Sequence, residues 1–117
     1  MAYALLGKNF TPPDVRAKVT GRGRYAEDFR AEGMAFCRLL TSPVPHGRVN
    51  SIDASEALAM DGVFGILTAD DVPTLPVPND PILSNEPMWV GQPILALAAV
   101  DETTAQDALE KIVLDIE

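Results

Sequence analysis

Residues 89–117, WVGQPILALAAVDETTAQDALEKIVLDIE, decide the fold that this sequence predicts. A Gly-Gln-Pro turn at 91–93 leads into an unbroken apolar run, residues 94–100, which predicts a strand buried on both faces. Asp101 stands at the expected N-cap of a helix, because its carboxylate can accept hydrogen bonds from the first backbone N–H groups. An extended apolar pattern resumes at 113–116. The order strand, helix, strand predicts a βαβ-like unit that needs a second layer from the rest of the chain.

Length and composition indicate one small folded domain. A chain of 117 residues can hold one hydrophobic core, and 47% hydrophobic residues with a mean hydropathy of +0.08 are typical of globular proteins. The longest apolar run is far shorter than the roughly 18 residues of a membrane span. The N-terminus lacks the basic and apolar regions of a signal peptide. Because Cys37 is the only cysteine, an internal disulfide is excluded and a cytoplasmic location is expected.

Turn residues divide the chain that precedes the decisive stretch. Residues 1–17 contain two adjacent prolines and no hydrophobic period, so they predict an N-terminal arm without regular structure. Residues 18–117 form the predicted domain, with further strands expected at 34–41, 48–52 and 63–67. The fold class predicted from these patterns is α+β, a single domain with a mixed β-sheet and short capped helices.

Acidic residues near the turns have structural explanations. Asp53 and Glu56 have the spacing of a capping box, and Gly62 is placed to end the short helix that would follow. One interpretation of the adjacent carboxylates Asp70 and Asp71 is a role in metal binding or acid–base chemistry. We instead expect them in the first turn of a short helix, where the macrodipole favours carboxylates.

Charge is distributed unevenly along the chain. Residues 1–48 hold eight Lys and Arg against four Asp and Glu, a net +4, whereas residues 49–117 carry a net −12. The basic half includes Arg22 and Arg24. A nucleic-acid partner is excluded by the overall charge of −8 and the few aromatic residues, because such binding depends on neutralising phosphates. A solvated charged surface is the simplest interpretation, and a protein partner is the alternative.

Few side chains carry potential chemistry. His46 is the only histidine, so no metal site or Ser-His-Asp arrangement can draw on several histidines, and a structural role is favoured. Strand alternation separates Cys37 from the neighbouring arginine, which favours a buried, inert thiol. Tyr25 and Phe29 are expected as core or interface anchors. Trp89 is expected in the core, whereas an exposed position would mark an interface.

Three stretches carry a resemblance to a known family. They are KVTGRGRYAEDF, LLTSPVPHGRVNSIDASEALAMDGVFGILTADDVP and VGQPILALAAVDETTAQDALEKIVLDI, which together span nearly everything from residue 18 onward. In this order they resemble the α/β hammerhead domain that opens the large subunit of the xanthine dehydrogenase and aldehyde oxidase family, the molybdenum hydroxylases. The resemblance implies an α/β hammerhead-like fold for residues 18–117.

The resemblance also implies cofactors in a larger complex. Members oxidise aldehydes or hydroxylate N-heterocycles at a molybdopterin-bound molybdenum, and electrons leave through two [2Fe–2S] clusters, often to FAD. The molybdopterin-binding segments and the catalytic glutamate lie in the domains that follow the hammerhead. No catalytic, cofactor-binding or metal-ligating residue is therefore carried onto this chain. A split gene, a nicked chain and an excised domain all remain open.

The implied role is that of a structural bridge between the iron–sulfur and molybdopterin-binding parts. The expected partners are a molybdopterin-binding large subunit, an iron–sulfur subunit and, where present, an FAD subunit. The residues expected at the subunit interface are Arg22, Arg24, His46, Trp89, Gly91, Gln92 and Pro93. The alternative is a stand-alone module that binds a small ligand or a protein, with a pocket under the proline-rich loop 73–88.

Overall fold

The computed structural model describes residues 6–73 and 81–117. Its backbone groups into two units, Met1–Glu32 and Gly33–Glu117, which are taken in turn below. The proline-rich loop expected at 73–88 lies partly outside the described residues.

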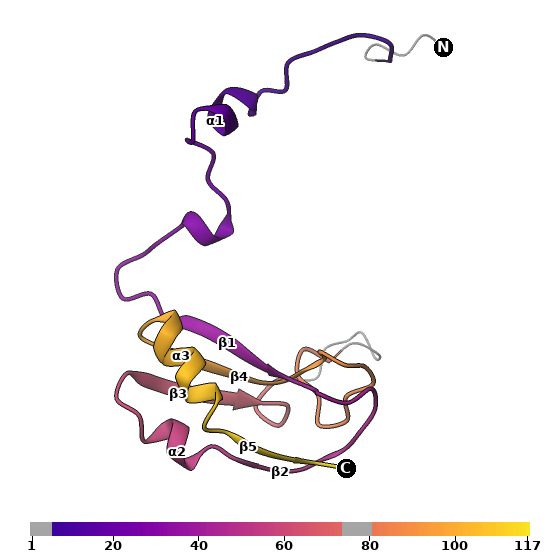
Figure 1. Cartoon of the computed structure of the whole chain (residues 1–117), viewed down its shortest axis with the longest axis vertical. Helices are drawn as coiled ribbons and strands as arrows, with labels where there is room; N and C mark the ends of the chain where they lie inside the picture. The colour runs from indigo at the N-terminus through magenta and orange to yellow at the C-terminus, as the bar shows by residue number, and fades with distance from the viewer. Residues whose placement is uncertain (1–5, 74–80) are drawn as a thin grey trace. The chain divides into compact units, whose positions relative to one another are not determined.

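Short helical turns are the regular structure of the described part of the first unit. They are the helix α1 (Val15–Val19) and the 3-10 turn η1 (Ala26–Asp28) (Figure 1). The prediction of an arm without regular structure up to residue 17 is therefore wrong from Val15 onward. A salt bridge of 2.6 Å between Lys18 and Asp14, four residues apart, supports this turn. The division of the chain between residues 17 and 18 stays a prediction.

The described residues of the second unit form five antiparallel strands and two short helices (Figure 1). The larger sheet has the strand order β1-β4-β3, and the smaller sheet pairs β2 with β5. The predicted α+β class with short helices is confirmed. The bounds are β1 (Phe36–Thr41), β2 (Val49–Asp53), α2 (Ser55–Leu58), β3 (Val63–Thr68), β4 (Pro93–Ala99), α3 (Glu102–Leu109) and β5 (Val113–Ile116).

Strand β4 is the centre of the core, as the apolar run predicted. Leu95, Leu97 and Ala99 are completely buried, and alternation places all three on the face that α3 covers. Helix α3 presents Ala105 and Ala108, also completely buried, and such small side chains let the helix approach the sheet closely. The helix face of this sheet is therefore a closed core.

The predicted βαβ-like unit is wrong in its pairing. The elements β4, α3 and β5 follow in the expected order, but β5 pairs with β2 in the second sheet instead of lying beside β4. In β2, a register shift between Val49 and Ser51 opposes two of its residues to one residue of β5. This bulge lets Val49 and Ile52, three residues apart, both pack against the core.

Of the two predicted aspartate caps, one is found and the other is displaced. Asp101 caps α3, with its Oδ1 accepting a hydrogen bond of 2.7 Å from the Thr104 backbone N–H. The N-cap of α2 is Ala54, so the prediction for Asp53 is wrong by one residue. Asp53 instead accepts hydrogen bonds from the backbone N–H and the hydroxyl of Ser55, which stabilise the turn that enters the helix.

Acid is expected to destabilise the domain partly through Asp101. Hydrogen bonds from the backbone N–H and side chain of Thr104 hold the pKa of Asp101 below its usual value. A lowered folded-state pKa contributes stability that is present above the unfolded-state pKa and is lost as pH falls through the folded-state value. Asn can cap without ionising, so Asp101→Asn is expected to weaken the dependence of melting temperature on pH below about pH 4.

Thermal unfolding followed by circular dichroism between about pH 3 and pH 7 measures this dependence. The matched control is Asp107→Asn, the same change at an exposed position within α3 that is not a cap. An equal flattening of the pH dependence in both variants would show that general charge, and not the cap, is responsible.

Candidate subunit interface

A tight turn at residues 88–92, called here the Trp89 turn, leads into β4. The Gln92 backbone N–H donates to the Trp89 carbonyl oxygen at 3.2 Å, which closes a four-residue β-turn. Gly91 occupies the third position with φ of +90°, a conformation that glycine adopts without steric cost. A turn was thus predicted correctly at this point, but it runs from Trp89 to Gln92 and not over 91–93, because Pro93 already belongs to β4.

Buried Gln92 holds the Trp89 turn on the body of the unit. Gln92 is only 2% exposed, and its side-chain Oε1 accepts a hydrogen bond of 2.6 Å from the Met88 backbone N–H. Its carbonyl oxygen accepts from the Ser42 N–H at 2.9 Å, and the Gly91 N–H donates to the Ser42 carbonyl at the same distance. The C-terminal end of the turn is therefore tied to the loop that follows β1.

The Trp89 turn presents three apolar side chains to solvent. Met88 is 58% exposed, Trp89 48% and Val90 62%. The expectation that Trp89 lies in the core is wrong, because the turn points its side chain outward while Gln92 takes the buried position. Exposed contiguous apolar side chains centred on tryptophan are typical of protein interfaces. The sequence analysis predicted that an exposed Trp89 would mark an interface, and Trp89 is exposed.

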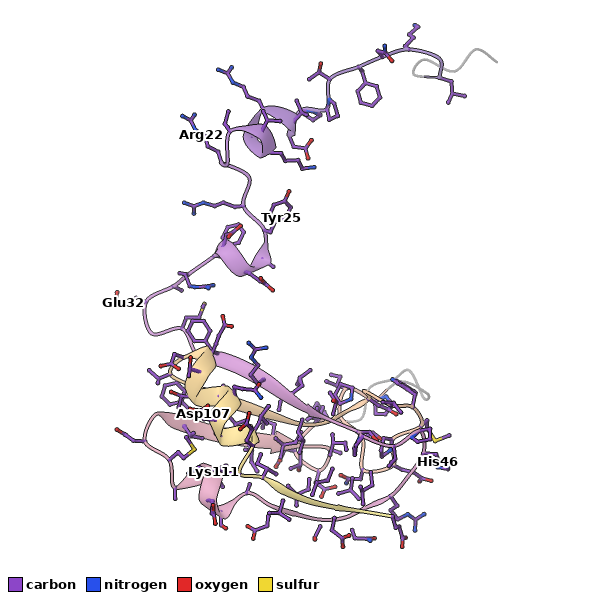
Figure 2. All side chains as sticks on the ribbon, viewed as in Figure 1. Arg22, Tyr25, Glu32, His46, Asp107 and Lys111 are labelled. Atoms are coloured by element: carbon purple, nitrogen blue, oxygen red, sulfur yellow. The ribbon has the colours of Figure 1, made fainter. Side chains whose placement is uncertain are left out.

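His46 lies on the loop 42–48, which is hydrogen-bonded to the chain that enters the Trp89 turn. The Gly47 N–H donates to the Pro87 carbonyl at 3.2 Å. The His46 Nε2 is 3.4 Å from an oxygen of Glu86, and Arg48 reaches the other oxygen at 4.0 Å. Figure 2 places His46 at the end of the second unit opposite Asp107 and Lys111. The structure thus brings His46 to the same end of the unit as the Trp89 turn.

Arg22 and Arg24 belong to the first unit and are exposed, and Arg22 is labelled in Figure 2. Their part in an interface stays a prediction. Tyr25 and Phe29 are 62% and 57% exposed, so the core alternative for these two residues is wrong and the interface alternative remains.

The acidic pair after β3 serves local structure. Asp71 accepts hydrogen bonds from the backbone N–H and hydroxyl of Thr68, which hold its pKa below the usual value. Asp70 accepts from the Asn85 side chain at 3.1 Å. The expected helical turn is a non-helical turn instead, because Asp71 reaches back to the residue that starts it. Within residues 6–73 and 81–117, no three His, Cys, Asp or Glu side chains are grouped to hold a metal ion.

Sequence reasoning did not identify the residues that support the interface from a distance. Ser42 and Glu86 are placed by hydrogen bonds and ion pairs to residues about 40 to 50 positions away in the chain, and no local pattern carries that information.

In the part of the chain that the structure describes, no helix is long and apolar enough to span a membrane.

Comparisons with known proteins agree with this fold. Residues 20–117 match the family described as "Aldehyde oxidase and xanthine dehydrogenase, a/b hammerhead domain". The chain belongs to this family. The carbon monoxide dehydrogenase large chain of Afipia carboxidovorans is 35% identical over 106 residues, which cover 83% of this chain and 13% of that protein. The nicotinate dehydrogenase large molybdopterin subunit of Eubacterium barkeri is 34% identical, with 98% of this chain and 28% of that protein covered.

The hammerhead fold is also found in solved structures. Quinoline 2-oxidoreductase from Pseudomonas putida 86 superposes with a TM-score of 0.82 at 29% identity, covering 95% of this chain and 16% of that chain. The present chain therefore spans less than a third of the length of each of these relatives. The predicted kinship with the xanthine dehydrogenase and aldehyde oxidase family is confirmed.

Proposed function

We propose that this hammerhead chain is a structural, non-catalytic part of a cytoplasmic molybdenum hydroxylase that oxidises aldehydes or N-heterocycles. In this role it bridges the iron–sulfur and molybdopterin-binding parts of the enzyme. The observation that carries the proposal is the Trp89 turn, in which Gln92 is buried so that Met88, Trp89 and Val90 can face outward. A rigid, exposed apolar turn is suited to contact another protein and offers no group for chemistry.

The donor groups of this chain do not fit the iron–sulfur clusters that the family implies. A [2Fe–2S] cluster takes four cysteine ligands, and Cys37 is the only cysteine here. The iron–sulfur clusters are accordingly assigned to other parts of the enzyme, where we also place molybdopterin-bound molybdenum and any FAD, and no catalytic step is assigned to the residues described here.

The relatives favour a partner that contains the molybdopterin site. The region shared with this chain makes up 13% of the Afipia carboxidovorans large chain but 28% of the Eubacterium barkeri protein, so polypeptides that contain a hammerhead differ in length about twofold. A hammerhead is thus found in large subunits of different lengths. We infer that the partner of this chain is the molybdopterin-binding remainder of a large subunit, joined by an iron–sulfur subunit and, in some complexes, an FAD subunit.

Native mass spectrometry of material purified from the natural host, with molybdenum and iron analysis, tests the proposal. The expected result is a complex several times the mass of this chain that contains both metals. A metal-free species near 12.6 kDa would contradict it and would favour the stand-alone binding module.

One observation favours that second function. An open hollow of about 260 Å³ lies on the larger sheet and is lined by Cys37, Phe64, Gly65, Ile66, Leu67, Ala96 and Ala98. It is not the pocket expected under loop 73–88, part of which lies outside the described residues. Ligand sites normally add a few converging polar groups to an apolar hollow, and the lining residues here are almost entirely apolar.

A further inference from the structure

The larger sheet has a second face, opposite α3, that no described element of the second unit covers. Its register shows which side chains share this outer face: Cys37 pairs with Ala98, and Leu39 and Leu67 both pair with Ala96. The neighbouring residue Arg38 points the other way, toward α3, where it forms a 3.0 Å ion pair with Glu102. The expectation of a buried thiol is therefore wrong, because alternation sends Cys37 to the uncovered side.

The outer face is apolar and exposed. Leu39 is 48% exposed, Leu67 54% and Phe64, beside an irregularity in the β3 register, 65%. Alanines of β4 line the middle while larger side chains flank it, which produces the hollow of about 260 Å³. No charged side chain lines this hollow. An antiparallel sheet that faces water normally alternates apolar with polar residues, and the outer face lacks that polar set.

The sequence of β4 itself is suited to burial on both sides. Its run ILALAA is apolar at every position, which is typical of a strand covered on two faces. Among the described helices, α3 packs against β4 and covers one of these faces. The strand therefore has the composition of a doubly covered strand and, among the described residues, lacks its second covering layer.

Building on the proposed function, we propose that this outer face docks against an apolar surface of the molybdopterin-binding part of a large subunit. The same fold, matched over 95% of this chain, makes up only 16% of the quinoline 2-oxidoreductase chain, so the family provides a much larger body of protein around it. A second copy of this chain is disfavoured, because each copy carries a net charge of −8 and two copies repel each other.

A small ligand is disfavoured as the occupant by the chemistry of the hollow. The Cys37 thiol is its one side chain able to form even a weak hydrogen bond, and that thiol lies 3.9 Å from the Arg38 carbonyl oxygen. Nothing else in the lining would orient a polar ligand. An apolar protein surface needs no such group, and small residues in the middle of the sheet allow its close approach.

The variant Leu67→Glu tests the docking surface in the complex purified from the host. A carboxylate in the middle of an apolar contact is expected to weaken association about 10- to 100-fold, measured as loss of the molybdenum-containing partner in native mass spectrometry. The matched control is Leu58→Glu, the same change on α2 at a similar exposure of 49%, which should retain the partner. Circular dichroism of both variants checks that the chain still folds.

The Cys37 thiol provides a second readout without any substitution. It is the only cysteine and lies exposed on the proposed surface, so alkylation by iodoacetamide is expected to be about tenfold or more slower in the complex than in the dissociated chain. If Leu67→Glu and Leu58→Glu keep the molybdenum-containing partner equally and Cys37 reacts at one rate in both states, the docking surface is wrong while the proposed function stands.

The remaining outcomes also decide the question. A wild-type chain that purifies without partner or molybdenum overturns both proposals. Protection of Cys37 in a dimer of this chain, or by a bound small molecule in a 12.6 kDa species, overturns docking to the large subunit in favour of those occupants.

Discussion

Leu97→Ala is expected to lower the free energy of unfolding by about 2–5 kcal/mol, the usual effect of replacing a fully buried leucine with alanine. Leu97 is completely buried on β4, where it pairs with Arg38 on one side and Ile66 on the other beneath α3. The neighbouring strands are fixed by their hydrogen bonds to β4, so the space left by the side chain cannot close fully. Such a loss is a large part of the total stability of a domain this small.

Denaturant unfolding of the purified chain, followed by circular dichroism, measures this loss as a lower midpoint at unchanged slope. The matched control is Leu67→Ala on β3, the same truncation at a side chain that is 54% exposed, for which a change within about 0.5 kcal/mol is expected in the isolated chain. Equal losses in the two variants would mean that the outer face is as well packed as the inner one, which would also contradict the docking surface.

Local patterns predicted the elements of the C-terminal region well. The unbroken apolar run predicted β4, the aspartate at 101 predicted the start of α3, and the resumed apolar pattern predicted β5. Each of these signals depends on residues within one or two turns of chain, where steric and hydrogen-bonding preferences act directly. A turn before β4 was predicted from Gly91 on equally local grounds, since glycine adopts the positive φ that such a turn requires.

Pairing and burial could not be predicted in the same way. No pattern within β5 identifies β2 rather than β4 as its partner strand, because strand pairing depends on the topology of the whole domain. Cys37 illustrates the limit on burial: alternation correctly separates it from Arg38, but which face α3 covers is decided more than sixty residues later. The burial of Trp89 and Gln92 was equally hard to predict. Trp89 was expected in the core but is exposed, and Gln92 was expected at an interface but is buried within this chain.

Placing a glutamine inside and a tryptophan outside opposes the ordinary preference of both side chains. The arrangement persists because the buried amide satisfies the Met88 N–H, a backbone donor that the tight turn leaves without a backbone partner among the hydrogen bonds described. An apolar residue in place of Gln92 would fill the same space but would leave that donor unpaired. The outward position of the apolar side chains on the Trp89 turn thus depends on the buried side chain of Gln92.

Gln92→Ala is accordingly expected to destabilise the domain by about 2–4 kcal/mol, because it leaves the Met88 N–H unpaired and opens a cavity. Trp89 is the only tryptophan, so its fluorescence reports on the turn directly: a shift to longer wavelength and lower anisotropy are expected. The matched control, Gln106→Ala, removes an exposed glutamine of α3 and should leave both signals unchanged. If Gln92→Ala loses stability while the Trp89 signal stays constant, the turn is held by Ser42 alone and the side chain of Gln92 serves the core instead. If the Trp89 signal changes and the partner is also lost, the outward position of Trp89 matters for assembly, as the proposed function requires.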